Sequence, residues 1–575
     1  MELDWPFTFN LSLSEVEKQA RRDSLDNHAL LAHFSAILPL FAALLVRLGL
    51  WLASKVSSAS RRDGYAQVPR SPVVKAQRSG AIGGLVARWR LLLWWLGDDV
   101  FAFGQHWGKR DEWVFGLGWF AWLFVLCWVG TGKDFLHFTK RFGLIAVSQL
   151  PIQHVLALKS INPYARAFRT SHESINRFHR VLGRVIYAIV TAHAVLYNVF
   201  FLEVGVWRKR FFAPVVFAGV AAFAALHLLS ATAARGVREW SYRAFFVTHL
   251  AVAFAVPALM FVHAPSSRFY IAKAVGVFLV DLGVRKFKNT VAAPSSLEVI
   301  PGTDLFRITA SVSPSRAATY HAKPGSHVYL SLPPETRPSP ADIIYEFLFN
   351  PFTVASADTE TGEITLVGRN RSGPMTNRLA DIAAATSAAD DGAKRMSSLM
   401  VEGPYGSAGK AFKSLVDANV DRVLVIAGGV GATFALPIYH ALLREMPSAK
   451  VKLIWAIRTA GDATWAAATT PPGAKPIMQD NGVELFLTGD MGISSSDSPS
   501  GGSIEMRSLG RGRADNPKRP DFAKIIDDTF RLGTEESVAI FVCGPAEMAR
   551  DVRRRTAPWV ERGRRVWWHD ESFGW

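Results

Sequence analysis

The stretch that decides the fold is FHRVLGRVIYAIVTAHAVLYNVFFL, residues 178–202. It is long and apolar enough to span a bilayer, yet it carries His179 and His193. A second stretch, AFFVTHLAVAFAVPALMFVHA at 244–264, carries His249 and His263 with the same separation of 14 residues. On a helix, 14 steps return to within about 40° of the starting direction and rise about 21 Å. Each helix is therefore expected to present two imidazoles on one face, one near each leaflet.

The two histidine pairs predict two levels of ligands inside the membrane. The two stretches are expected to run in the same direction, which puts His179 level with His249 and His193 level with His263. Two facing imidazoles at one level can ligate a haem iron from both sides. The alternative interpretation is ordinary polar contacts within a helix bundle. Two pairs with one spacing, on two parallel spans, favour the ligand interpretation.

Further apolar stretches complete a predicted bundle of about seven spans. They lie at 28–53, 113–130, 142–158, 211–232 and 269–285. The stretch at 142–158 is the weakest, because it contains two glutamines, a proline and a histidine. The stretch at 28–53 lacks a small-residue cleavage site, so it is interpreted as a retained span and not a signal peptide.

Basic residues in the connections set the predicted orientation. Lys and Arg gather in 54–112, 159–177 and 233–243 and directly after residue 285, although a basic run at 208–210 lies on the opposite side. The positive-inside rule then places the N-terminus outside and everything after residue 285 in the cytosol. Asn10-Leu11-Ser12 forms a glycosylation sequon on the predicted outer side.

Composition supports an apolar block joined to a polar block. The chain has 575 residues, of which 49% are hydrophobic and 20% charged, and its formal net charge is +17. The basic excess lies beside apolar runs and no nucleic-acid motif is present, so it indicates a lipid bilayer and no nucleic-acid partner. Two cysteines exclude a disulfide framework and a thiolate zinc site.

Short β-like runs with Gly and Pro turns begin after Lys288 and predict a small antiparallel barrel over about 292–405. Asn350-Pro351-Phe352-Thr353 lies within it. Shortly afterwards, a Gly-Pro pair precedes Thr376 and the helical pattern 377–385. Free backbone N–H groups at such a helix start suit a pyrophosphate.

From about residue 420 the pattern is α/β. The buried strand 421–427 leads into Gly428-Gly429-Val430-Gly431-Ala432-Thr433 and a helix. Such a turn lets the backbone approach a dinucleotide phosphate, although it is not the G-x-G-x-x-G form. Strand 451–457 ends at Arg458 and strand 538–542 ends at Cys543, which places both at the ligand-binding edge of the sheet. The alternatives are a solvated loop charge for Arg458 and a small buried residue for Cys543.

The ordered set of motifs resembles the fungal ferric/cupric reductases of the flavocytochrome b superfamily, which also contains the NADPH oxidases. The set comprises two His-x13-His pairs, N-P-F-T, E-G-P-Y-G, G-G-V-G-A-T and C-G-P, and the resemblance covers about 113–575. It implies one FAD, two b-type haems and NADPH. The implied haem-iron ligands are His179, His193, His249 and His263.

The resemblance also implies sites in the polar half. The implied flavin-binding residues are Asn350, Pro351, Phe352, Thr353, Gly373 and Thr376, with Phe352 near the ring system and Thr353 near its polar edge. The implied nicotinamide-nucleotide-binding residues are Gly403, Pro404, Tyr405, Gly406, Gly428, Gly429, Gly431, Thr433, Gly544 and Pro545. Cys543 lies at the implied nicotinamide site and is, with Phe573 and Trp575, an expected catalytic residue. The family ends in an aromatic residue that covers the flavin, which is here Phe573 or Trp575. The family usually has His where this chain has Asn350.

The expected fold is multidomain. An α-helical transmembrane haem bundle is followed by a β-barrel FAD-binding domain and an α/β NADPH-binding domain like that of ferredoxin–NADP reductase. The expected divisions are an exoplasmic tail 1–27, a first span 28–53, a basic cytosolic loop 54–112, a bis-haem core 113–288, an FAD barrel 292–415, and an NADPH domain 420–575 with a disordered insertion 491–520.

The expected function is a multi-pass metalloreductase of the plasma or vacuolar membrane. Electrons would pass from cytosolic NADPH through FAD and two haems to extracellular Fe(III) or Cu(II) chelates, supporting metal uptake alongside an iron permease or oxidase. A superoxide-generating NADPH oxidase is the alternative enzyme, but here both histidine pairs are His-x13-His and no calcium-binding loop is present. A seven-span receptor or transporter is the remote alternative, because neither needs a flavin and dinucleotide module. Arg458 predicts NADPH over NADH, since a guanidinium can pair with the 2′-phosphate.

Overall fold

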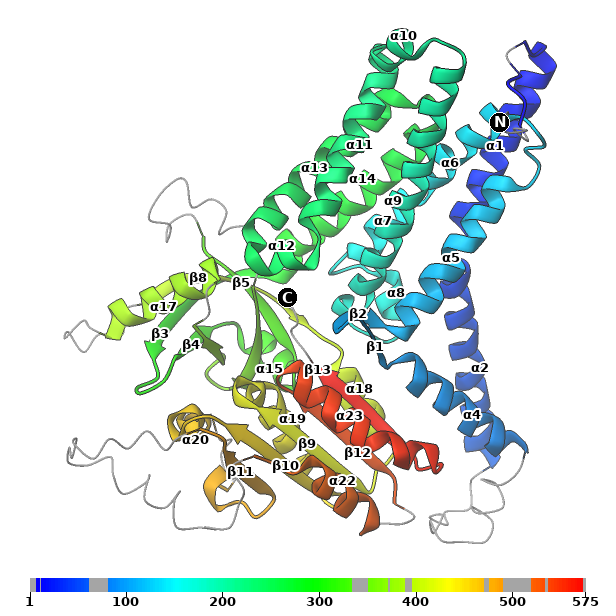
Figure 1. The fold of residues 1–575 in the computed structure, drawn as a ribbon. Helices are drawn as coiled ribbons and strands as arrows, with labels where there is room; N and C mark the ends of the chain where they lie inside the picture. The colour runs from blue at the N-terminus through cyan, green and yellow to red at the C-terminus, as the bar shows by residue number, and fades with distance from the viewer. Residues whose placement is uncertain are drawn as a thin grey trace. The chain divides into compact units, whose positions relative to one another are not determined.

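The computed structural model divides the chain into two compact units (Figure 1). The structure describes residues 7–10, 12–60, 81–333, 350–370, 373–387, 396–469, 475–489, 519–532 and 536–571. The first unit takes in the described residues of 1–64 and 95–286. The second takes in those of 65–94 and 287–575. Phe573, Trp575, Leu11 of the sequon and most of the expected insertion 491–520 lie outside the described residues.

Helices cover every predicted span of the first unit. The long ones are α1 (Glu15–Ser35), α2 (Leu38–Ser60), α5 (Arg110–Trp128), α6 (Phe135–Ser148), α7 (Leu150–Ala157), α9 (His172–Glu203), α11 (Pro214–Thr232), α13 (Tyr242–His263) and α14 (Arg268–Val284). Four of these stretches are long and apolar enough to cross a membrane by length and composition: Glu15–Leu52, α9, α11 and α13. The others are shorter, interrupted or begin with charged residues.

Two predicted boundaries differ from the structure. Helix α1 begins at Glu15, where Ser14 caps it, so helix occupies much of the segment expected to be a tail. The weak span at 142–158 is two helices, α6 and α7, which meet at Gln149 and together start at Phe135. Pro151 lies in the first turn of α7, where its missing N–H costs no hydrogen bond.

A buried carboxylate ties the last helix of the bundle to the connection after α7. Asp281 of α14 is 4% exposed, and it accepts hydrogen bonds from the backbone N–H groups of Ser160 at 2.9 Å and Ile161 at 3.0 Å. The N–H of Lys159 also points at it, at 3.3 Å. These N–H groups lie just beyond the end of α7, and the carboxylate gives them an acceptor that lipid could not supply.

The second unit begins with a closed six-stranded barrel, in the order β3-β4-β7-β6-β5-β8. Its strands are β3 (Thr290–Val299), β4 (Leu305–Ser311), β5 (His327–Ser331), β6 (Asn350–Ala357), β7 (Glu363–Arg369) and β8 (Met396–Tyr405). All pairs are antiparallel. Helix α17 (Pro374–Ser387) packs on β3 and contributes Met375 and Leu379 to the barrel core. The predicted barrel is therefore present over nearly the predicted range.

A parallel five-stranded sheet follows, in the order β11-β10-β9-β12-β13. Its strands are β9 (Arg422–Gly428), β10 (Lys450–Ile457), β11 (Val483–Leu487), β12 (Val538–Cys543) and β13 (Val566–Glu571). Helix α19 (Ala432–Glu445) packs on β9 and β10, while α22 (Phe522–Arg531) and α23 (Ala546–Glu561) pack on each other. The three predicted strands are β9, β10 and β12, and they are adjacent. The fold class predicted from the sequence is confirmed.

The expected basic loop 54–112 contains regular structure that sequence reasoning missed. Helix α4 (Ala81–Leu96) belongs mostly to the second unit. It is followed by a hairpin of β1 (Asp99–Ala102) and β2 (Gln105–Lys109), which belongs to the first. Positive φ angles at Phe103 and Gly104 form the tight turn of this hairpin.

Replacing Asp281 by Ala should destabilise the helical unit. Two half-buried backbone N–H groups would lose their buried acceptor, at up to about 1–3 kcal/mol each. We expect the thermal unfolding midpoint of the detergent-solubilised protein to fall by several degrees. Asp304→Ala, at a half-exposed carboxylate of the barrel, is the matched control and should change it far less. Equal midpoints for Asp281→Ala and the unaltered protein would contradict this account.

Candidate cofactor sites

The imidazoles of α9 and α13 meet inside the bundle. His179 and His249 lie with ring centroids 6.1 Å apart and ring planes inclined by 57°. Two metal–nitrogen bonds of about 2 Å plus the two ring radii require about 6 Å between centroids. The separation therefore fits one metal ion held between the two rings.

Backbone carbonyls orient three of the four rings. The Nδ1 atoms of His179, His193 and His263 lie 2.9, 2.9 and 2.8 Å from the carbonyl oxygens of Gln153, Thr139 and Val215. Each Nδ1 therefore carries the proton, and each Nε2 keeps its lone pair for a ligand. His249 Nδ1 is buried and has no hydrogen-bond partner among the described residues. The Gln153 amide lies 3.4 Å from His179 Nε2, a long contact.

Glycines make room for the rings of His193 and His263, the second of the two histidine levels. A Cβ on Gly143 of α6 would lie 2.6 Å from the nearest atom of the His193 ring. A Cβ on Gly219 of α11 would lie 2.4 Å from the nearest atom of the His263 ring. In both places the glycine follows the hydrogen-bonding carbonyl by four residues, so one turn of helix supplies both the acceptor and the gap. Sequence reasoning missed these glycines, because a glycine in an apolar helix has no distinctive spacing.

The N-P-F-T segment lies where β6 enters the barrel. Asn350, Pro351, Phe352 and Thr353 pair with β5, with Thr353 opposite His327. The Phe352 side chain is 7% exposed and packs against Phe306 in the barrel core. Thr353 is 5% exposed. The structure thus gives Phe352 a packing role, and its contact with a flavin ring stays a prediction.

Polar and aromatic side chains gather where β5 meets the end of β8. The Tyr405 hydroxyl donates to Glu402 at 2.5 Å, and the Tyr405 ring lies 5.5 Å from that of Tyr329 and 6.3 Å from that of His327. Gly406 has φ of 108°, which favours glycine, and a Cβ there would lie 3.2 Å from the His327 ring. Gly403 and Pro404 form the preceding end of β8. His327 and Glu402 thus contact predicted site residues, and the sequence analysis did not single them out.

A helix N-terminus lies next to the same barrel. Gly373 directly precedes α17, and the Thr376 hydroxyl donates to its carbonyl at 3.0 Å. The first backbone N–H groups of a helix have no internal partner and attract anions. The segment predicted to hold a pyrophosphate therefore has the required backbone form.

The glycine turn after β9 lies against the turn after β12. A Cβ on Gly431 would lie 2.2 Å from the Cys543 carbonyl oxygen, and one on Gly544 would lie 3.0 Å from the Gly428 nitrogen. Gly428 itself leaves room for Pro545 and Met548. Gly429 has φ of +54°, and Thr433 caps the turn by donating to the Val430 carbonyl at 2.9 Å. The two predicted nucleotide motifs thus form one surface at the carboxyl ends of adjacent strands.

Cys543 is buried beside this surface. Its side chain is 5% exposed, and burial together with the Glu571 carboxylate raises the pKa of its thiol. Cys543 is therefore a neutral thiol at ordinary pH and not a thiolate nucleophile. Glu571 lies opposite it on β13 and pairs with His569 at 3.0 Å.

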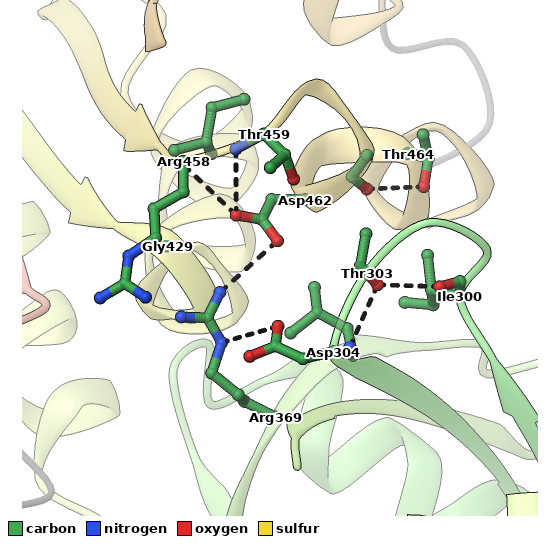
Figure 2. Close-up of polar contacts among 12 residues, drawn as sticks. Ile300, Thr303, Asp304, Arg369, Gly429, Arg458, Thr459, Asp462 and Thr464 are labelled. Atoms are coloured by element: carbon green, nitrogen blue, oxygen red, sulfur yellow. Dashed lines mark hydrogen bonds and ion pairs between the residues drawn. The ribbon is translucent and has the colours of Figure 1, made fainter. Parts of the chain in front are cut away.

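Arg458 follows β10, and Figure 2 draws its guanidinium with no dashed contact to the other residues shown. Its side chain is exposed, while its backbone N–H points at the Asp462 carboxylate at 3.3 Å. Asp462 is 3% exposed and lies 3.5 Å from the Arg369 guanidinium of the barrel. Arg369 also reaches Asp304 at 3.2 Å. The Asp462 carboxylate is thus engaged internally, and among the described residues the Arg458 guanidinium makes no ion pair.

Three parts of the chain match known family models. Residues 142–260 match the ferric reductase like transmembrane component, residues 293–409 an FAD-binding domain, and residues 420–557 the ferric reductase NAD binding domain. The chain belongs to the ferric reductase family. It is a membrane protein whose helical unit precedes an FAD-binding domain and an NAD-binding domain, as the sequence predicted.

Curated relatives of this ferric reductase family member come from fungi. The probable metalloreductase AIM14 of Meyerozyma guilliermondii is 24% identical over 72% of this chain and 79% of its own length. The protein of the same name from Yarrowia lipolytica is 28% identical over 59% of each chain. The ferric/cupric reductase transmembrane component 2 of Saccharomyces cerevisiae is 26% identical over 55% of this chain and 42% of its own length. The chain thus spans three fifths or less of the last two.

Replacing Gly219 by Ala should displace the His263 imidazole and lower haem binding. The added methyl would overlap a ring that is held by its bond to Val215. We expect bound haem per polypeptide, measured by the pyridine haemochrome spectrum, to fall to about half, since one of two ligand levels is altered. Gly276→Ala is the control, because a Cβ there meets nothing within 4 Å. Unchanged haem content in Gly219→Ala would contradict the role of this glycine.

Proposed function

We propose that the protein is a transmembrane metalloreductase that carries electrons from cytosolic NADPH to Fe(III) or Cu(II) chelates outside the cell. The carriers would be FAD in the barrel, a haem held by His179 and His249, and a haem held by His193 and His263. The observation that carries the proposal is the set of imidazoles whose Nδ1 atoms are bound to carbonyls, which leaves the proton off Nε2, in a chain that also has the flavin and nucleotide domains.

When bound, FAD and the haems would supply the conversion of a two-electron hydride donor into single electrons. The protein's own residues bind and orient. The Gly428–Gly431 turn and the adjacent Gly544 let backbone approach a pyrophosphate, and the start of α17 offers N–H groups to a second one. The carbonyls of Thr139 and Val215 hold the outer-level imidazoles in one tautomer and orientation.

The proposed orientation puts the nucleotide-binding unit in the cytosol and the outer histidine pair near the outside. It is supported by the basic connections and by the order of the histidines along α9 and α13. The plasma membrane is the proposed location. Relatives named metalloreductase and ferric/cupric reductase support metal chelates as acceptors.

His193→Ala tests the proposed electron path. Removing one ligand should abolish the outer haem and lower whole-cell reduction of Fe(III) and Cu(II) chelates by at least about tenfold. NADPH should still bleach the flavin, because the flavin and nucleotide sites lie in the other unit. His154→Ala is the matched control, since the His154 ring contacts the Leu150 carbonyl of its own helix at 2.9 Å.

Two results would contradict this proposal. One is His193→Ala protein that retains both haems and full chelate reduction. The other is unaltered protein whose membranes form superoxide from NADPH faster than they reduce metal chelates, which would establish an oxidase instead.

Arg458→Ala tests the choice of NADPH. A charge-assisted hydrogen bond to the 2′-phosphate is worth about 1.5–3 kcal/mol, so the KM for NADPH should rise at least about tenfold. The KM for NADH should hardly change, because that nucleotide lacks the phosphate. Arg554→Ala is the control, since its guanidinium is exposed and pairs with Asp551 on the same helix. Equal effects of Arg458→Ala on both nucleotides would exclude recognition of the phosphate.

A further inference from the structure

Along the chain, helix α4 comes between the predicted spans 28–53 and 113–130, and it is too short to be a span itself. It covers Ala81–Leu96, 16 residues, whereas a span needs about 20. It is nevertheless almost free of polar residues, with Arg88 and Arg90 its only charged side chains. Because the helix is too short to span the bilayer, hydrocarbon does not surround it on all sides. Its apolar side therefore needs another cover.

The apolar side chains of α4 form one exposed arc. Large hydrophobic residues stand 44–65% exposed along the helix: Leu85, Val86, Trp89, Leu92 and Leu93. At 100° per residue they occupy an arc of about 120°. The two arginines lie roughly 40° beyond its two edges, one on each side. An apolar arc bordered by cationic side chains is the pattern of a helix lying in a membrane interface.

The opposite face of α4 is bound to the nucleotide-binding domain. Trp94 lies about 180° from Leu85. Its carbonyl accepts a hydrogen bond from Arg553 of α23 at 2.7 Å, and the same guanidinium lies 4.2 Å from the centroid of its ring. The Trp94 ring also lies 5.7 Å from that of Trp568 on β13. The protein therefore covers the Trp94 side and leaves the arc open.

Residues at the carboxyl end of α4 and just after it contact Arg110, the first residue of α5. Arg110, the first residue of α5, stacks over the Trp95 ring at 5.0 Å and pairs with Asp98 at 3.2 Å. Its backbone N–H donates to the Asp98 carbonyl at 2.8 Å. Helix α5 contains the predicted span 113–130, and on that prediction the junction lies where the chain enters the bilayer, at the depth of the lipid headgroups.

We propose that α4 lies in the headgroup layer of the bilayer, with the Leu85–Leu93 arc in lipid and Trp94 bound to the nucleotide-binding domain. Apolar burial drives insertion, and the arginines attract anionic headgroups while their stems cover apolar surface. The occupant of the arc is thus a lipid surface. The helix is a membrane anchor for the domain that binds the nucleotide, in addition to the spans.

The test uses the full-length protein in nanodiscs of phosphatidylcholine and phosphatidylserine. Trp89→Cys and Leu92→Cys are labelled with bimane, and Arg554→Cys on exposed α23 is the matched control. The native cysteines, Cys127 and Cys543, are buried. We expect lipids that carry a doxyl quencher to quench both arc positions at least about twofold more than the control, and aqueous iodide to quench them less.

Two results would overturn the proposal. Iodide quenching of the arc positions equal to that at Arg554→Cys would mean that the arc faces water. Protection from both quenchers would mean that protein, and not lipid, covers it. Native-like thermal unfolding of each labelled variant ensures that either result refers to folded protein.

Discussion

The hydrogen bond from a histidine Nδ1–H to a backbone carbonyl is the interaction on which the helical unit's proposed chemistry depends. An imidazole within a membrane span finds no water to satisfy its N–H, so the group must bond to protein. A carbonyl of a neighbouring helix meets this requirement at His179, His193 and His263. The same bond selects the tautomer in which Nε2 carries a lone pair and could act as a ligand. One hydrogen bond thus satisfies the buried N–H group and orients the ring for the proposed site.

That bond also dictates how closely the helices approach. At His193 and His263 the ring lies where a Cβ would stand, because Gly143 and Gly219 follow the carbonyls of Thr139 and Val215 by one turn. The nucleotide-binding domain obeys a similar constraint. Gly431 and Gly544 let the turns after β9 and β12 touch backbone to backbone. In both units, missing Cβ atoms bring together chain segments that are far apart in sequence.

Polar residues that weakened a prediction proved to organise the bundle. Gln149 and Pro151 make 142–158 the least apolar of the predicted spans, and the structure has a helix junction there. The Gln149 side chain accepts from the Trp119 indole at 3.2 Å, and the Gln153 carbonyl orients His179. Helix α4 escaped prediction for a different reason. It lies in a connection rich in basic residues, and its 16 residues are too few to predict a membrane span.

The sequence by itself determined the family, the order of the domains, the barrel, the central strands of the parallel sheet and the identity of the paired histidines. These follow from local patterns: apolar length, a 14-residue repeat, β alternation and glycine turns. Only the tertiary structure decided which carbonyls bind three of the four imidazoles, that Phe352 packs in the barrel core, and that Arg369 engages Asp462 while Arg458 is exposed. Such contacts join residues from separate elements, and no local spacing encodes them, because they arise when side chains from different elements compete for the same small volume.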